Sequence, residues 1–89
     1  MREITKTTRF KKDFKRATKR GFPEAALVEI LSQLVNDRPL SKRCNPHKLV
    51  GEYVDTWECH IAPDWLLIYE YFENELRLRR LGTHSDLFR

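Results

Sequence analysis

The spacing of apolar residues changes once along this chain of 89 residues, and that change limits the possible folds more than any other feature. In the first part of the chain, apolar residues recur every three or four positions, which is the spacing of a helix with one buried face. Past Gly51 they alternate with polar residues, as in a strand with one buried face. A chain of this length holds a single hydrophobic core, so both patterns belong to one domain covering residues 1–89.

Two helices are predicted before Gly51. The first runs from Arg9 to Arg20 and is capped by Thr8, and the second runs from Pro23 to about Asn36. Their apolar stripes consist of Phe10, Phe14 and Ala17 in the first helix and of Leu27, Ile30, Leu31 and Leu34 in the second, widened by Val28 and Val35. Because Gly21 ends the first helix just before the second begins, we expect an antiparallel helical hairpin.

Strand patterns flank the helices on both sides. The Thr-rich segment 2–7 suits a first strand at an edge of the sheet. Three further strands follow the polar loop 36–45 and are joined by tight turns. These strands and turns are the segment ending at Ile61, the turn Ala62-Pro63-Asp64, the central strand Trp65–Phe72, the turn Glu73-Asn74-Glu75 and the strand Leu76–Leu81.

The order of these elements predicts an α+β domain: an N-terminal strand, a helical hairpin and an antiparallel three-strand meander, with both helices on one face of the sheet. Cys59 and Ile61 alternate with Glu58 and His60, so the two pairs face opposite sides. If the apolar pair faces the helices, His60 lies on the other face. We expect that face to be open to a large polar substrate.

Positive charge is concentrated at the start of the chain, and the net charge is +4 with histidine neutral. Residues 1–20 contain nine Lys or Arg and two acidic residues, whereas the segment 52–75 contains acidic residues and no Lys or Arg. A basic domain of this size most often binds nucleic acid or an acidic protein. A solvated surface with surplus lysines is the alternative.

Several features favour a cytoplasmic protein with no membrane association. The longest apolar run, Trp65–Tyr69, is far too short to span a bilayer, and residues 1–20 lack the apolar stretch of a signal peptide. In a reducing compartment Cys44 and Cys59 would be free thiols, although one disulfide stays possible.

The three histidines fall at the ends of predicted elements rather than on apolar stripes. Imidazole can both give and take a proton near neutral pH. Cleavage of RNA without a metal needs a base for the 2′-hydroxyl, cations for the charge on phosphorus and an acid for the leaving 5′-oxygen. His47, His60, Asp64 and His84, together with nearby arginines, supply all three, so we assign these four residues a catalytic role.

Each of these residues also has a simpler interpretation. A single strand histidine is usually just exposed or hydrogen-bonded, and Pro-Asp is common in turns. The same three histidines and Asp64 could instead bind zinc, although they lack a compact motif. A cysteine nucleophile has less support, because neither thiol lies at a predicted helix N-terminus or in a paired motif.

The whole chain resembles the YafQ branch of the RelE/ParE superfamily, the toxin halves of bacterial type II toxin–antitoxin pairs. Three motifs carry the resemblance: His47-x-Leu49-x-Gly51-x-Tyr53, then Cys59-His60-Ile61-x-Pro63-Asp64-Trp65-x-Leu67-Ile68-Tyr69, and Arg80-x-Gly82-Thr83-His84-Ser85-Asp86-Leu87-Phe88. The resemblance implies a RelE-like fold. It also implies a cofactor-free endoribonuclease that cuts mRNA in the A site of the 70S ribosome and is neutralised by a cognate antitoxin protein.

The resemblance also assigns roles to individual residues. The catalytic and RNA-contacting set of the family falls on the four residues named above and on Phe88. Many relatives have an arginine three residues before the central histidine, where this chain has Trp57. The charge that stabilises the phosphate would then come from Arg80, Arg79 or Arg43, and we expect these arginines and Phe88 to contact RNA.

Two alternatives without catalysis remain. ParE-like toxins share the fold but inhibit DNA gyrase by binding it, without this set of histidines. A basic RNA-binding module with no chemistry is the other. Both leave the three histidines and Asp64 in their motif positions unexplained.

Overall fold

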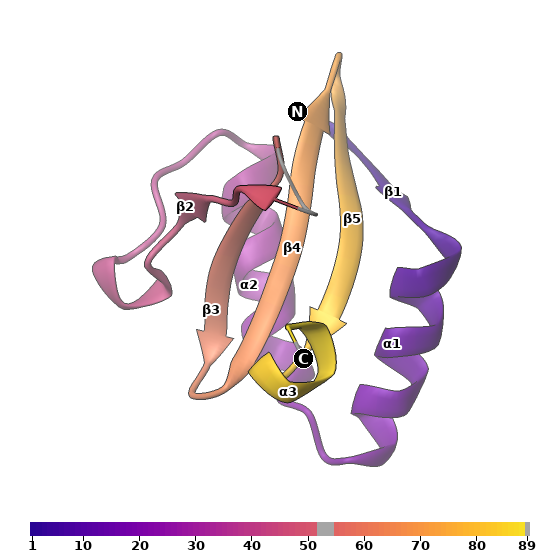
Figure 1. Ribbon diagram of the computed structural model, residues 1–89. Coiled ribbons are helices and arrows are strands. Elements are labelled where there is room, and N and C mark those ends of the chain that lie inside the picture. The colour runs from indigo at the N-terminus through magenta and orange to yellow at the C-terminus, as the bar shows by residue number, and fades with distance from the viewer. Residues whose placement is uncertain (52–54, 89) are drawn as a thin grey trace.

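The computed structural model describes residues 1–51 and 55–88, so Tyr53 of the first motif lies outside the described residues. In chain order the elements are β1 (Glu3–Lys6), α1 (Thr8–Lys19), α2 (Glu24–Val35), the short helix η1 (Lys42–Cys44), β2 (His47–Lys48), β3 (Trp57–Ala62), β4 (Trp65–Phe72), β5 (Glu75–Gly82) and α3 (His84–Leu87) (Figure 1). They form one sheet of order β1-β5-β4-β3-β2, in which β1 is parallel to β5 and the other pairs are antiparallel. The predicted α+β fold is confirmed, including the first strand at an edge.

The first helix begins one residue earlier than the sequence indicates. Thr7, not Thr8, is the cap, because the Thr7 hydroxyl oxygen accepts a hydrogen bond from the Phe10 N–H at 3.0 Å. Thr7 also ends the pairing of β1, since its own N–H donates to the Leu78 carbonyl at 3.1 Å. One residue therefore closes the strand and opens the helix.

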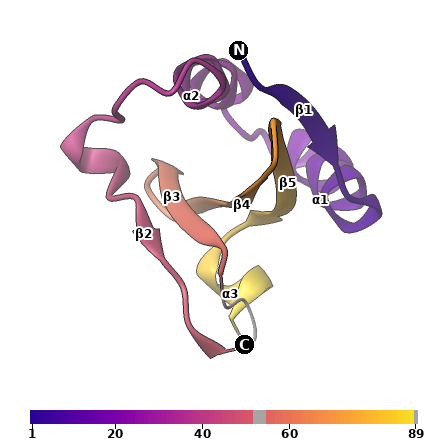
Figure 2. The same ribbon diagram turned by 90° about the horizontal axis from the view of Figure 1, so that it is seen from above.

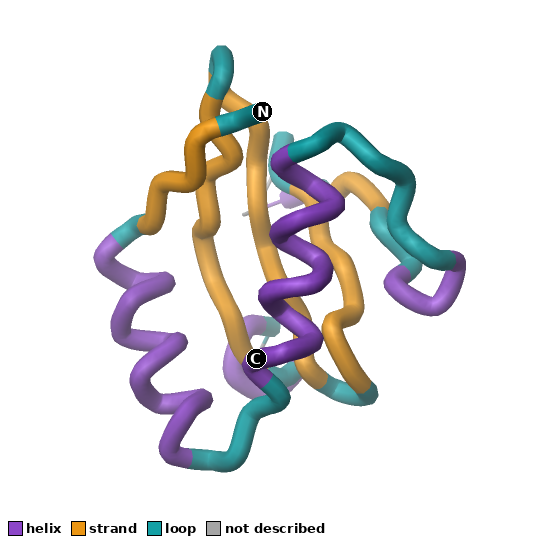
Figure 3. The backbone as a smooth tube through the Cα atoms, turned by 180° about the vertical axis from the view of Figure 1, so that it is seen from behind, coloured by secondary structure: helices purple, strands orange, loops and turns teal. Residues whose placement is uncertain are grey.

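Both helices lie on the same face of the sheet, as predicted, and run in opposite directions (Figure 2 and Figure 3). α1 packs on β5, and α2 packs on β3. The core between them and the sheet includes Phe10, Ala17, Leu27, Ile30, Leu34, Cys59, Ile61, Leu67, Tyr69, Leu78 and Leu81. Val28 was expected in this core but is 65% exposed. It lies about 100° around the helix from Leu27, which turns it away from the sheet.

The opposite face of the sheet is only partly open, which corrects the expectation of an uncovered surface. Leu66 and Ile68 of β4 are fully buried there beneath Leu87 of α3, and Leu49 packs against them. Figure 2 shows α3 on the side of the sheet away from α1 and α2. The C-terminal helix therefore forms one wall of the surface that carries the candidate residues, which we call the site face.

A β-bulge in β5 decides which arginine faces this surface. Ile68 pairs with Arg80 and Tyr69 pairs with Leu78, so Arg79 is an extra residue in β5. The alternation of side chains reverses at this point. Leu78 and Leu81 consequently both point into the main core, while Arg80 points to the same side as its partner Ile68. Without the bulge, Arg80 would share the buried side of Leu78.

Candidate active site

A row of paired residues crosses the site face from β2 to β5. His47 of β2 pairs with Glu58 of β3, Glu58 pairs with Ile68 of β4, and Ile68 pairs with Arg80 of β5. Directly paired residues point to the same side, and neighbouring strands are about 4.8 Å apart. The row therefore places Glu58 and Arg80 on either side of the apolar residue Ile68. His60 follows Glu58 by two residues and points to the same side of the sheet.

Glu58 links two of the histidines. Its Oε1 lies 3.4 Å from His47 Nε2 and 3.8 Å from His60 Nε2, and its side chain is only 6% exposed. His47 Nδ1 lies 2.8 Å from the Asn45 carbonyl oxygen. A carbonyl can only accept, so Nδ1 carries a hydrogen and His47 presents Nε2 to the carboxylate.

The third histidine lies beside His60 and is oriented by Asp64. Asp64 Oδ1 is 3.2 Å from His84 Nδ1 and accepts the His84 backbone N–H at 3.3 Å. The rings of His60 and His84 have centroids 6.0 Å apart, and the Phe88 ring is 6.1 Å from His84. His84 and Asp64 are 57% and 65% exposed, respectively. The four residues predicted to be catalytic thus lie on one surface. Glu58 lies between His47 and His60, and the series continues with His84 and Asp64.

Two tight backbone features place Asp64 and His84. Asp64 follows Pro63 in a two-residue turn and has φ of 59°, a left-handed conformation that aspartate tolerates better than most residues. His84 is the first residue of α3, and Thr83 and Asp86 form a capping box in front of it. Gly82 leaves room for that box, since a Cβ there would lie 2.9 Å from Asp86 Cβ.

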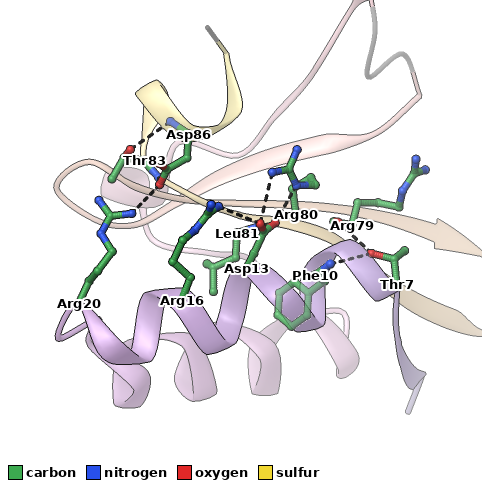
Figure 4. Close-up of polar contacts among 10 residues, drawn as sticks. All are labelled: Thr7, Phe10, Asp13, Arg16, Arg20, Arg79, Arg80, Leu81, Thr83 and Asp86. Carbon is green, nitrogen blue, oxygen red and sulfur yellow. Dashed lines mark hydrogen bonds and ion pairs between the residues drawn. The ribbon is translucent and has the colours of Figure 1, made fainter.

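The capping box is tied to α1 by an ion pair (Figure 4). Arg20 Nη1 donates to Asp86 Oδ2 at 2.9 Å, and the Thr83 backbone N–H donates to the same oxygen at 3.0 Å. The Thr83 backbone hydrogen bond, with the Arg20 guanidinium and the Thr83 hydroxyl, lowers the pKa of Asp86 to about 2. The start of α3, and with it His84, is therefore held by a charged carboxylate.

The predicted RNA-binding arginines have different environments. Arg80 is 8% exposed, and its Nε donates to Asp13 Oδ2 at 2.7 Å, so it is held inside the protein and is not a mobile surface cation. Arg79 is partly exposed and pairs with Glu70 at 3.1 Å. Arg43 lines a hollow of about 270 Å³ beside His60, between η1 and the end of β3.

Trp57 does not face the site. It packs against the main core with the helices, and Lys48 lies over its ring at 5.9 Å. An arginine at this position, as in many relatives of the resembled family, would start from the helix side of β3. The tryptophan therefore removes no cation from the face that carries the histidines, and Arg80 is the arginine that the strand pairing brings into the row.

The cysteines are buried and free in this structure. Burial raises the pKa of the Cys59 thiol to about 12, with smaller contributions from Cys44 and Glu58. A thiol with such a pKa is protonated at neutral pH and is a poor nucleophile. The Cys59 thiol is therefore not a candidate nucleophile.

Comparison with known proteins identifies the family. Residues 2–89 match the family model described as the bacterial toxin of type II toxin–antitoxin systems, YafQ. The chain belongs to the YafQ toxin family. The resemblance read from the three motifs is thereby confirmed.

Individual proteins are similar to this chain over nearly their whole length. The mRNA interferase toxin YafQ of Escherichia coli is 35% identical over 88 residues, which cover 98% of this chain and 96% of that protein. A copper-bound mutant toxin from Helicobacter pylori has a TM-score of 0.94 at 38% identity, covering 99% of this chain and 100% of that one. The E. coli DinJ–YafQ complex matches with a TM-score of 0.90 at 34% identity and full coverage of both chains.

Two residues of the site were not predicted from the YafQ-like motifs. Glu58 was placed on the His60 side by strand alternation, but its position between His47 and His60 depends on the pairing of β2 with β3. Asp13 has no motif, and it reaches Arg80 from a helix 67 residues away in sequence. The i, i+2 spacing from His60 was the one signal that pointed to Glu58.

No helix within residues 1–51 and 55–88 is long and apolar enough to cross a membrane. In the same part of the chain, no three His, Cys, Asp or Glu side chains are arranged to hold a metal ion.

Proposed function

We propose that this YafQ-family protein is an endoribonuclease that cuts mRNA in the A site of the 70S ribosome by metal-independent acid–base catalysis. The observation that carries the proposal is the convergence of three histidines, Glu58 and Asp64 on the site face, next to the row that ends in Arg80. The relative in E. coli that is named an mRNA interferase toxin supports the choice of substrate. Translating ribosomes place this activity in the cytoplasm.

The reaction transfers two protons across one phosphate. His60, supported by Glu58, takes the proton of the 2′-hydroxyl, and the 2′-oxygen attacks phosphorus. The bond from phosphorus to the 5′-oxygen breaks as His84 donates a proton to that oxygen. The products are a 2′,3′-cyclic phosphate and a 5′-hydroxyl end. The spacing of 6.0 Å between the two rings suits groups that act on opposite sides of a phosphate.

The surrounding residues support these roles. Asp64 Oδ1 lies 3.2 Å from His84 Nδ1 and so orients the ring that acts as the general acid. Arg80 supplies positive charge for the phosphorane oxygens. Phe88 beside His84 offers a ring on which a base can stack, while Arg43 and Arg79 contribute charge along the path of the RNA.

The absence of a catalytic metal is part of the proposal and needs its own test. His47 and His60 both direct Nε2 at one carboxylate oxygen, and a related toxin from H. pylori is copper-bound. These atoms are also an acid–base relay without any metal. Elemental analysis of the purified protein, with cleavage assayed after extraction of transition metals, distinguishes metal-dependent from metal-independent cleavage. One tightly bound metal per chain that is required for cleavage would contradict a mechanism of proton transfer alone.

The proposed partner that neutralises the protein is a cognate antitoxin, as the DinJ–YafQ complex suggests. Between α1 and α2 lies an apolar groove of about 260 Å³, and it is lined by Lys6, Phe10, Lys11, Phe14, Leu27, Val28, Leu31 and Leu78. The two lysines at the groove suit an amphipathic, acidic segment of the antitoxin. Val28→Asp should weaken antitoxin binding at least tenfold and leave cleavage unchanged. Equal affinity would remove the groove from the interface.

Cleavage of a defined codon on purified, programmed ribosomes tests the catalytic proposal. The wild type should produce 2′,3′-cyclic phosphate and 5′-hydroxyl ends under single-turnover conditions. Glu58→Gln keeps the shape of the side chain but cannot take a proton, and it should cut at least tenfold more slowly. Intact RNA with the wild type, together with blocked DNA supercoiling, would favour gyrase inhibition. Binding to ribosomes without cleavage would favour a non-catalytic RNA-binding module.

A further inference from the structure

The carboxylate that holds Arg80 is not on the sheet but on α1. Asp13 is 5% exposed and accepts four hydrogen bonds at its two oxygens (Figure 4). Arg80 Nε donates to Oδ2 at 2.7 Å and Arg80 Nη2 to Oδ1 at 3.3 Å. The Leu81 backbone N–H donates to Oδ2 at 3.1 Å, and Arg16 Nη2 donates to Oδ1 at 3.2 Å.

Two of these contacts fix the direction of the Arg80 guanidinium. A carboxylate that meets both Nε and Nη2 lies in the plane of the guanidinium and defines its rotation as well as its position. A single contact would fix only a distance. Asp13 therefore restricts the long, flexible arginine side chain to one arrangement at the end of the row that begins at His47.

The third contact anchors the backbone that turns Arg80 toward the site. Leu81 follows Arg80 directly, and both come just after the extra residue Arg79 of the bulge. By accepting the Leu81 N–H, Asp13 holds the strand where its alternation has been reversed. Side chain and backbone of the same segment are thus fastened to one carboxylate.

We infer that Asp13 is a positioning residue for the proposed cleavage, which acts on the phosphate only through Arg80. This inference rests on the proposed function, in which Arg80 stabilises the charge that develops on phosphorus. A preorganised cation stabilises that charge without first having to reorient. Asp13 itself touches no substrate, so its loss affects the rate of the chemical step and not the binding of ribosomes.

A double-mutant cycle in the single-turnover ribosome assay tests this inference. Asp13→Asn keeps the shape of the side chain but removes its charge, and Arg80→Met keeps the length of the arginine stem without the guanidinium. We expect Asp13→Asn to lower the maximal rate at least tenfold while the half-saturating ribosome concentration stays within twofold. In the Arg80→Met background, Asp13→Asn should change the rate by less than twofold.

The matched control is Asp37→Asn. Asp37 also pairs with an arginine, Arg2, at 3.0 Å, but it is exposed and lies outside the site row. This variant should cleave at the wild-type rate. If Asp13→Asn slows cleavage equally with and without Arg80, or acts by raising the half-saturating concentration, Asp13 does not work through Arg80 and the inference is overturned. Normal cleavage by Arg80→Met would overturn it too, and would leave the histidine mechanism intact.

The fixed position of Arg80 can also be tested on the wild-type protein, so this test does not depend on whether a variant folds. In an NMR spectrum, the Arg80 Nε–H should exchange with solvent at least tenfold more slowly than that of Arg9, an exposed residue of α1, because Asp13 accepts the Arg80 Nε–H at 2.7 Å. Exchange at the rate of Arg9 would contradict a fixed guanidinium. A wild type that cuts no RNA on ribosomes, yet shows the protected Arg80 signal, would refute the proposed function and with it any role of Asp13 in cleavage.

Discussion

The two halves of the candidate site are built differently. The histidine half is open to solvent, and each imidazole is oriented by one or two contacts, as between His84 and Asp64. The Arg80 half is almost fully buried, and several hydrogen bonds converge there on Asp13. Groups that exchange protons must reach both substrate and water, whereas a group that stabilises charge works best when it is held still. The difference therefore matches the difference between the two proposed tasks.

The largest expected effect lies in the open half. His60→Ala and His84→Ala should each lower single-turnover cleavage by roughly 10²–10⁴-fold, the usual contribution of one general acid or base. Both side chains are at least partly exposed, so their removal leaves no core cavity, and urea unfolding should change by less than about 0.5 kcal/mol. If both stably folded variants cut at nearly the wild-type rate, the open half does not perform the chemistry.

A smaller loss is expected for the residues that support these histidines. Asp64→Ala should slow cleavage by about 10²-fold, because water can replace part of its contact with His84. His47→Ala should fall near the same value, since it reaches His60 only through Glu58. The same ribosome assay measures both. A loss at His47 that exceeds the loss at His60 would reverse the proposed roles of the two residues.

Substitutions in the buried half should change the free energy of unfolding more than substitutions at exposed ion pairs. Arg80→Met leaves the carboxylate of Asp13 with Arg16 as its charged partner, and it should lower the free energy of unfolding by about 3 kcal/mol. Arg79→Met is the neighbouring control, because its pair with Glu70 is partly exposed and contributes less than about 1 kcal/mol. Urea titration measures both values, and the slope of the unfolding free energy against urea concentration should stay unchanged. Equal values for the two variants would erase the contrast between the halves.

The open half could be predicted from the sequence better than the buried half, because its signals are local in sequence whereas the buried half depends on contacts between distant segments. Alternation along β3 places His60 opposite the helices, and the turn at Pro63-Asp64 is a local signal. The Arg80 arrangement depends on a bulge and on a partner in α1, neither of which follows from local spacing. The adjacent pair Arg79-Arg80 interrupts the alternation of Leu76 and Leu78, and that interruption is the available sign of the bulge.

The same limit explains the two errors about surfaces. Val28 is next to the apolar stripe of α2 in sequence, but its position about 100° around the helix from Leu27 leaves it exposed. The site face was expected to be open because both predicted helices pack on the other face, and α3, with only four residues, shows no helical periodicity. Leu87 nevertheless covers Leu66 and Ile68 there. Short elements that pack at the end of a chain are decided by tertiary contacts.

The link between α1 and α3 adds a pH dependence. Asp86 has a pKa of about 2 in the folded protein, below its ordinary value of 3.8. A lowered carboxyl pKa stabilises the fold above the ordinary value, and this stabilisation is lost as pH falls toward 2. Asp86→Asn should cost about 1 kcal/mol at pH 6. The difference from the wild type should shrink between pH 4 and 3 in urea titrations; a constant difference would mean that charge plays no part.

The smallest effect is expected at the rim of the site face. Arg79→Ala should weaken ribosome binding about evenly across codons and reduce the slope of log affinity against log salt by about one. Arg9→Ala makes the same change in charge on α1, outside the sheet, and serves as the comparison. A codon-dependent loss at Arg79 would show that this residue reads the message and does not merely attract it.

Mapping the 5′ ends of cellular mRNA after induction without antitoxin tests the central claim most directly, with the wild type compared against His84→Ala. We expect new 5′-hydroxyl ends within codons of translated messages for the wild type, and their loss, at equal protein level, for the variant. Growth arrest with intact mRNA would contradict the proposed function. The same ends at undiminished frequency from His84→Ala would contradict acid–base catalysis by the exposed half of the site.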